Sequence, residues 1–195
     1  NITNTVTVTG GTLSVNAADT VASVVQSGGT IQGIATLTTG TYTQSGGTLD
    51  GIVSASGTKT LNGGEISGLL QGAGATTIQT GTTTVSGTIV GNVTVASSGT
   101  LRIDGVTAVS GTITASGSTI SYADLASENS EIILSATGTD FEVFGGETAE
   151  QSGVISESAG GMGLNKTGTG TLALTGANTY GGVTHVIGGT LVAGH

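Results

Sequence analysis

The sequence at residues 26–33 reads QSGGTIQG and returns at residues 44–51 as QSGGTLDG. A third copy, NGGEISG at residues 62–68, follows at almost the same interval, and GGTL at residues 188–191 closes the series. Self-similarity at a period of about 20 residues is the signature of a solenoid, in which each repeat stacks on the one before it. The glycines suit the tight corners that such a coil needs.

Polar and apolar residues alternate in short runs along the whole chain. Residues 5–9 read TVTVT, residues 100–104 read TLRID and residues 171–175 read TLALT. Alternation with β-branched residues is typical of strands that bury one face. The best helical pattern, at residues 122–133, is short and is not continued on either side.

A repeating unit that holds only strands and turns predicts an all-β fold, a parallel β-helix. A leucine-rich repeat would need a Leu-rich frame that is missing, and a propeller blade would need about 40 residues. At the usual spacing between strands we expect roughly 8–10 coils in a rod on the order of 40–50 Å long. One continuous core would run through it, so residues 1–195 would form a single domain.

Composition excludes several classes of function. The chain has 195 residues, no Cys and no Pro, and its three Lys and Arg against 12 Asp and Glu give a formal net charge of −9. So few bases cannot neutralise a run of phosphates, and we expect no nucleic-acid partner. Without Cys the chain has no thiol nucleophile and no Cys-ligated zinc site.

Catalytic motifs are also missing from the sequence. It has no Gly-x-Ser-x-Gly elbow, and its two histidines are His185 and His195. The three bases, Lys59, Arg102 and Lys166, are isolated from one another in sequence. We therefore expect a protein that is not an enzyme and that holds no cofactor and no metal ion.

An acidic segment interrupts the regular pattern. Residues 124–157 hold eight of the 12 acids, both Phe residues and no Lys or Arg. We therefore divide the domain into regular shaft coils at residues 1–123, acidic irregular coils at residues 124–160 and further coils at residues 161–195. The alternation predicts that Phe141 is buried and that Phe144 lies on the exterior or in a turn. The segment is either a solvated acidic face or an interaction surface, whose candidate residues are Asp140, Glu142, Phe144, Glu147 and Glu150.

The segment at residues 164–186 reads LNKTGTGTLALTGANTYGGVTHV, and residues 188–191 follow as GGTL. It closely resembles the autotransporter-associated β-strand repeat, whose pattern is Leu-x-Lys-x-Gly-x-Gly-Thr-Leu-x-Leu-x-Gly-x-Asn-Thr-Tyr-x-Gly followed by Thr-x-Val and Gly-Thr-Leu. Nearly every defining position of that repeat is present. The resemblance makes residues 161–195 the repeat coils and gives Lys166 and Tyr180 structural roles.

The resemblance also implies a biological setting. It implies a right-handed β-helix that is the passenger domain of a type V secreted protein of a Gram-negative bacterium. Such a passenger crosses the periplasm and leaves through its own C-terminal outer-membrane barrel. We therefore expect this chain to be a fragment of a longer passenger and to lie outside the cell or on the outer cell surface.

Three functions follow from these features. The first is an adhesive and structural module for cell–cell or host-surface adhesion, including self-association, because a β-helix offers flat faces of Thr, Ser, Asn and Gln. The second is a secreted ligand or toxin fragment that binds a host receptor through the acidic segment. The third and most remote is ice binding, for which Thr-x-Thr pairs begin at residues 36, 58, 82, 112 and 137. Their unequal spacing argues against the third function.

Overall fold

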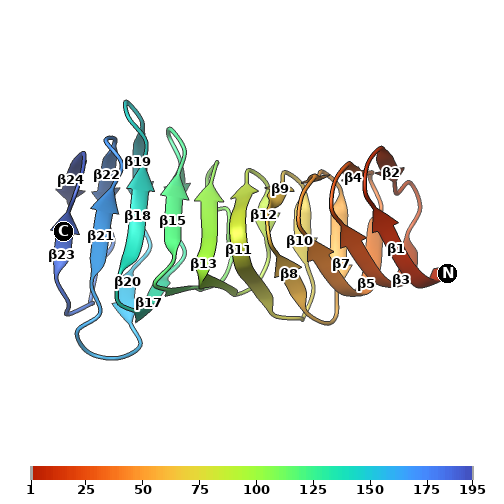
Figure 1. The fold of residues 1–195 in the computed structure, drawn as a ribbon, viewed down its shortest axis with the longest axis horizontal. Helices are drawn as coiled ribbons and strands as arrows, with labels where there is room; N and C mark the ends of the chain where they lie inside the picture. Colours follow the sequence, from red (N-terminus) through yellow and green to blue (C-terminus); the bar gives the residue numbers. More distant parts are fainter. Residues whose placement is uncertain (1, 195) are drawn as a thin grey trace.

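The computed structural model describes residues 2–194, which form a rod of 24 β-strands without an α-helix. Figure 1 shows the strands stacked side by side, with the two ends of the chain at opposite ends of the rod. Successive turns pair in parallel, and the chain winds through about 10 of them, which confirms the predicted all-β solenoid. Within the described range no helix is long and apolar enough to cross a bilayer.

Each turn of the solenoid passes through three faces in the same order, here called A, B and C. Face A contains the first parts of β3 (Asp19–Gln26) and β5 (Thr36–Gln44), then β7 (Ile52–Ala55), β10 (Leu69–Gln71), β12 (Thr88–Ile89), β16 (Ser127–Glu128), β19 (Thr148–Gln151), β22 (Thr171–Leu174) and β24 (Thr190–Ala193). Face B contains β1 (Ile2–Val8), the later parts of β3 and β5, β8 (Lys59–Leu61), the first parts of β11 (Thr76–Val85) and β13 (Val93–Ile103), β14 (Ile113–Ser116), β17 (Ile132–Ala136) and β20 (Ile155–Glu157).

Face C completes each turn. It contains β2 (Thr12–Ser14), β4 (Thr30–Gln32), β6 (Thr48–Leu49), β9 (Gly64–Ile66), the last parts of β11 and β13, β15 (Thr119–Tyr122), β18 (Thr139–Val143), β21 (Leu164–Thr167) and β23 (Thr184–Val186). The helical pattern at residues 122–133 gives no helix, because these residues end β15, turn, and form β16 and the start of β17. Pairing with the neighbouring turns outweighs the local helical preference there.

Face A is interrupted in the middle of the rod. Strands β16, β19, β22 and β24 form a separate four-stranded sheet, while the other 20 strands belong to one sheet. Between β12 and β16 the face is linked by isolated bridges, from Ile89 to Val109 and from Val106 to Ser127. The turn at residues 104–111 therefore replaces a regular strand.

Alternation points every second residue of a strand into the rod. Residues at the same register position in successive turns lie above one another, so the inward residues form the stacks of the core. On face B one inward stack runs through Leu61, Ile78, Val95, Ala115 and Leu134, and all five are fully buried. Burial of one such aliphatic side chain stabilises the fold by about 1.5–3 kcal/mol. The rod is thus held by continuous aliphatic stacks, as the alternation predicts.

Glycine allows the turns to approach closely at the corners. At Gly33 φ is 130°, and an added Cβ would lie 2.1 Å from the carbonyl oxygen of Val15 in the previous turn. No residue with a side chain fits that position. Among the described residues, 15 glycines have positive φ, and Thr107 and Leu125 are the other two residues that do.

Turns in the second half of the rod are longer than those in the first half. Register partners on face B are evenly spaced in the sequence over three turns, from Thr43 to Thr60, Thr77 and Thr94. The next partners, at positions 114, 133 and 156, are farther apart, and the last of these intervals is the longest. The stacks stay in line, so most of the extra residues lie in the corners; one lies within β17, where the register shifts between the partners of Ala115 and Ser116.

Candidate functional site

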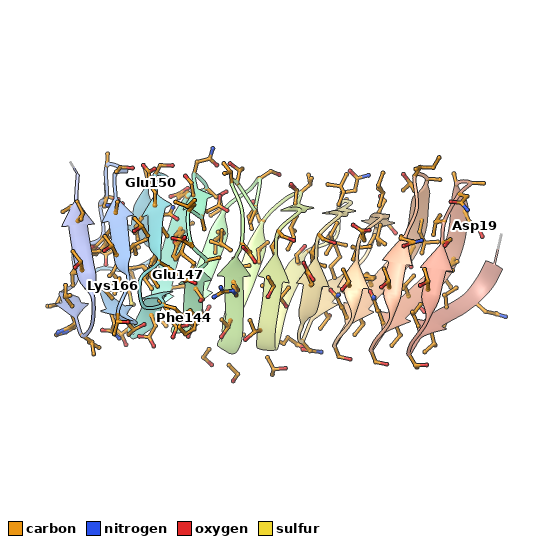
Figure 2. The ribbon with its side chains drawn as sticks, turned by 90° about the horizontal axis from the view of Figure 1, so that it is seen from above. Asp19, Phe144, Glu147, Glu150 and Lys166 are labelled. Carbon is orange, nitrogen blue, oxygen red and sulfur yellow. The ribbon has the colours of Figure 1, made fainter. Side chains whose placement is uncertain are left out.

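The five candidate surface residues lie around one corner of a single turn. Asp140 and Glu142 project outward from β18 on face C, Phe144 and Glu147 belong to the turn that follows, and Glu150 projects from β19 on face A. Figure 2 places Phe144 and Glu150 at opposite edges of the rod. The structure thus brings the first four together along one strand and its turn and separates Glu150 from them. That they form an interaction surface stays a prediction.

Two of these acids are hydrogen-bonded to the next turn. Asp140 Oδ1 accepts a hydrogen bond from Asn165 Nδ2 at 2.9 Å, and Glu150 Oε1 accepts one from Thr175 Oγ1 at 2.6 Å. Phe144 is half exposed, and the guanidinium carbon of Arg102 lies 5.4 Å from the centre of its ring. Asp140 and Glu150 therefore contribute to the stacking of turns, whereas Phe144 presents an apolar surface to solvent.

The rod also contains a buried polar cluster that the sequence analysis did not identify. The carboxylate of Glu128 is fully buried and accepts hydrogen bonds from the backbone N–H groups of Val109 at 3.2 Å and of Asn129 and Ser130 at 3.0 Å each. Nearby, the Tyr122 hydroxyl donates to Gln151 Oε1 at 2.9 Å. Burial raises the pKa of Tyr122, and the negative charge of Glu128 raises it further.

Two of the three bases hold the backbone of neighbouring turns. Lys166 Nζ donates to the carbonyl oxygens of Thr167 at 2.6 Å and of Gly168 and Gly188 at 3.3 Å each. Burial lowers the pKa of Lys166, and the charge of Glu142 opposes part of that shift. Lys59 Nζ donates to the carbonyl oxygens of Gly72, at 3.0 Å, and Gly74, and burial lowers its pKa as well. Both ammonium groups serve as internal ties between turns.

The histidines do not form part of a cluster in the described range. His185 is exposed on β23 and lies in register with Asn165 of β21. His195 lies outside the described residues. No group of three or more His, Asp or Glu side chains that could hold a metal ion occurs in residues 2–194.

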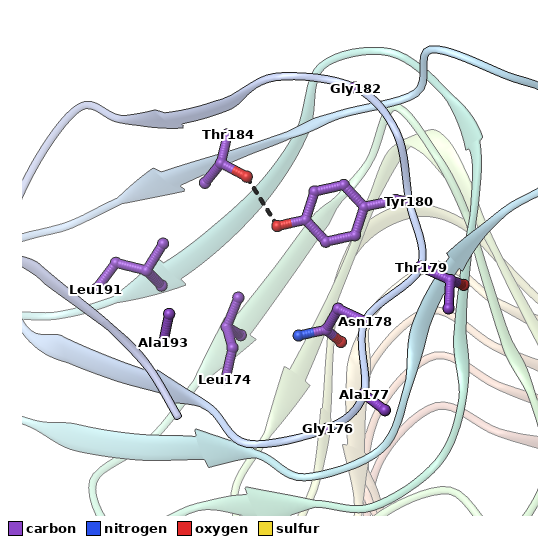
Figure 3. Close-up of a pocket in the computed structure, with 10 residues that line it drawn as sticks. All are labelled: Leu174, Gly176, Ala177, Asn178, Thr179, Tyr180, Gly182, Thr184, Leu191 and Ala193. Carbon is purple, nitrogen blue, oxygen red and sulfur yellow. Dashed lines mark hydrogen bonds between the residues drawn. The ribbon is translucent and has the colours of Figure 1, made fainter. Parts of the chain in front are cut away.

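A cavity of about 820 Å³ lies at the last turns of the rod (Figure 3). It is bounded by Leu174, Leu191 and Ala193 and by the turn at residues 176–182. The Tyr180 hydroxyl and Thr184 Oγ1 are 2.7 Å apart across one wall. None of the lining residues is charged, and Asn178, Thr179, Tyr180 and Thr184 lie beside the aliphatic ones, so the cavity surface is partly polar and uncharged.

The outward side of face B is uncharged over seven turns. Its central row of register partners is Thr7, Val25, Thr43, Thr60, Thr77, Thr94 and Thr114. The residues two positions earlier in each turn are Thr5, Ser23, Thr41, Thr58, Ala75, Asn92 and Thr112. All of these are half-buried or exposed, and neither row contains Asp, Glu, Lys or Arg. Face B thus presents mostly hydroxyl and amide groups.

The threonine pairs considered for ice binding lie on different faces. Thr38 belongs to face A, Thr60 to face B and Thr84 to face C, which explains their unequal spacing in the sequence. The central row of face B has five consecutive threonines, but the row beside it is interrupted by Ala75 and Asn92. The two regular rows that an ice template would need are therefore not both present on face B.

Comparison with known families gives one finding for the last turns. Residues 164–193 match the model of the passenger-associated-transport-repeat, and comparisons with curated proteins and with solved structures gave no match. In the structure the matched residues form β21 to β24 and contain the Lys166 tie and the Tyr180–Thr184 contact. The family implies secretion to the cell surface. The chain therefore fits an autotransporter passenger that carries a passenger-associated-transport-repeat at residues 164–193.

Proposed function

We propose that this passenger is an adhesive and structural module rather than an enzyme, and that it acts outside the cell through face B. The observation that carries the proposal is the uncharged outward side of face B. Each hydroxyl can both donate and accept a hydrogen bond, so a second flat surface can dock on it through many weak contacts. At a strand spacing of about 4.8 Å the seven turns span roughly 29 Å.

The distribution of charge favours this face over the others. The chain carries a formal net charge of −9, and face C presents acids such as Asp50, Glu65 and Asp140. Two copies that met through face C would bring like charges together, which is unfavourable. On face B no charged side chain opposes contact in the seven turns described above. We infer that face B makes the contact in self-association and in adhesion to a surface.

The test places charge on one face at a time. In the variant Thr60→Glu/Thr77→Glu, two register partners on face B become negative, and we expect loss of self-association in analytical ultracentrifugation and of clumping by cells that display the chain. The matched control, Thr82→Glu/Thr100→Glu, changes two register partners on face C and should retain both. Equal loss in both variants, or no loss in either, would reject face B as the contact. Unfolding midpoints near that of the parent chain show that the variants are folded.

A further inference from the structure

Three consecutive turns expose a large apolar side chain at the corner between faces C and A. Val106 is 74% exposed, Leu125 is 78% exposed and Phe144 is 48% exposed. They follow β13, β15 and β18, whose last residues Ile103, Tyr122 and Val143 are register partners. The three turns are therefore neighbours, and Figure 1 shows those after β15 and β18 rising above the rest of the row. We call residues 104–107, 123–126 and 144–147 the corner patch.

The backbone of the corner patch is strained at Leu125 and at Thr107, the residue after Val106. Leu125 has φ of 60° and Thr107 has φ of 56°, whereas the other described residues with positive φ are glycines. The left-handed conformation costs a residue with a Cβ about 1–2 kcal/mol. Glycine would relieve this strain at Leu125 but would remove the exposed side chain. Backbone strain of this kind is concentrated at active sites and ligand-binding sites.

Hydrogen bonds hold the patch in one shape. Leu125 N donates to the carbonyl of Thr148 at 2.7 Å, and Thr148 N donates to Asp124 Oδ1 at 2.9 Å. Arg102 reaches across one turn, with Nη1 3.4 Å from Ser121 Oγ, and its guanidinium covers the ring of Phe144. A surface whose backbone is already held in place loses less entropy when a partner binds.

The charge around the patch is negative. Asp104, Asp124 and Glu147 belong to its three turns, and Glu142 lies on the strand that leads into the last of them. One carboxylate oxygen of Glu147 is buried and has no hydrogen-bond partner in the described structure. Of the three bases in the chain, Lys59 and Lys166 are buried; Lys166 interacts with Glu142 from the interior, and Arg102 is the base that lies at the patch.

We propose that the corner patch binds a protein whose contact surface combines apolar side chains with flanking Lys or Arg. An apolar centre with a rim of opposite charge is the arrangement that gives both affinity and orientation in protein interfaces. If a second copy of this chain docked here through the same patch, the acids of the two copies would face and repel each other. The patch would repel a nucleic acid or an anionic lipid surface for the same reason. The contact is separate from face B and adds a heterotypic partner to the proposed adhesive function.

The experiment measures binding of the whole chain to three fluorescent synthetic peptides by anisotropy. The first, KKLFKK, is apolar and cationic; the second, KKSSKK, is cationic alone; the third, EELFEE, is apolar and anionic. We expect the first to bind, the second to bind at least about fivefold more weakly, and the third not to bind. Binding of the first should weaken as salt is raised from about 0.15 M to 1 M.

Two variants locate the contact. Leu125→Gly should weaken binding of KKLFKK about five- to tenfold and should leave the chain folded, because glycine accepts the backbone conformation at this position. The control Ile34→Gly removes a similarly exposed side chain from a distant corner and should not change binding. Equal effects of the two variants, or equal binding of KKLFKK and KKSSKK, would overturn the proposal.

A third variant separates this contact from the one on face B. Thr60→Glu/Thr77→Glu should leave peptide binding unchanged, so that a failure of the proposed adhesive face and a failure of the corner patch give different results. Loss of self-association in Leu125→Gly with peptide binding unchanged would also overturn the proposal, since it would assign the patch to a second copy of this chain.

Discussion

The carboxylate of Glu128 accepts a hydrogen bond from the backbone N–H of Val109, 19 residues earlier in the chain, at 3.2 Å. Val109 lies where face A loses its regular strand, between β12 and β16. The side-chain oxygen thus takes the position of a backbone carbonyl that a strand would have supplied. Its second oxygen satisfies the N–H groups of Asn129 and Ser130, so one buried side chain repairs the break in the face.

Replacement of Glu128 by Ala should therefore strongly destabilise the rod. Three backbone N–H groups, of which those of Val109 and Ser130 are buried, would lose their acceptor, and removal of a buried partner of this kind costs about 3 kcal/mol or more. Urea unfolding followed by circular dichroism measures the loss. Glu131→Ala is the matched control, because Glu131 is exposed and its contact is with Ser156 Oγ at 2.8 Å; it should cost less than about 1 kcal/mol. Similar losses in the two variants would contradict the role given to Glu128.

Lys166→Met should lower the free energy of unfolding by about 2 kcal/mol, because methionine fills the volume of the buried stem but leaves the carbonyls of Thr167, Gly168 and Gly188 unpaired. Asn165→Ala, one residue away on the outward side of the same strand, should cost less than about 1 kcal/mol. Both values come from urea denaturation. A Lys166→Met chain as stable as the parent would show that water satisfies these carbonyls.

The inward and outward positions of β22 should differ sharply in tolerance of charge. Leu172 is fully buried in the stack between Ala149 and Leu191, so Leu172→Asp should cost several kcal/mol. Thr171 faces outward and is half-buried, so Thr171→Asp should cost about 1 kcal/mol or less. Thermal melting of the two variants gives the comparison. Equal small effects would mean that the register of β22 is wrong.

Stability should fall as the pH rises above 10. Burial raises the pKa of Tyr42 and Tyr122 above the ordinary value of 10.0, so the unfolded chain loses these protons first. The contribution of these two tyrosines to the free energy of unfolding is complete below pH 10. Above pH 10 it decreases by about 1.4 kcal/mol per pH unit for each tyrosine that stays protonated in the folded chain. The pKa values of Lys59 and Lys166 are lowered in the folded chain, so these two lysines make stability rise with pH up to pH 10.5.

The contribution of one tyrosine can be isolated by substitution. In Tyr42→Phe the slope of the unfolding free energy against pH, measured between pH 10.5 and 11.5, should be shallower than in the parent chain by about 1.4 kcal/mol per unit. Because the lysine contributions are the same in both chains, they cancel in the difference. An unchanged slope would show that Tyr42 ionises in the folded chain.

Alternation in the sequence was sufficient to place much of the core. It put Phe141 inside and Phe144 on the exterior or in a turn, and the structure has Phe141 buried and Phe144 exposed at the turn after β18. The same parity also points Lys59 inward, since residues 58–61 read TKTL, and Lys59 is indeed buried. Its burial was missed because a lysine is expected at the surface, and its partners are turn carbonyls 13 and 15 residues later that no local pattern reveals.

Less of the candidate site could be predicted from the sequence. Glu150 follows Phe144 closely in the chain, yet the corner between β18 and β19 carries it to another face. Leu125 and Val106 were not identified, because their exposure depends on turn conformations that break the alternation. The irregular spacing of the threonines likewise came from comparing positions on different faces.

The lengthening of the turns along face B has a consequence for how such a chain can change over time. A residue inserted within a strand would reverse the inside and outside of every position that follows in that strand. A residue inserted at a corner leaves the stacks untouched. Lineages of this protein can therefore acquire new surface features through longer corners, while the residues of the buried stacks stay the same.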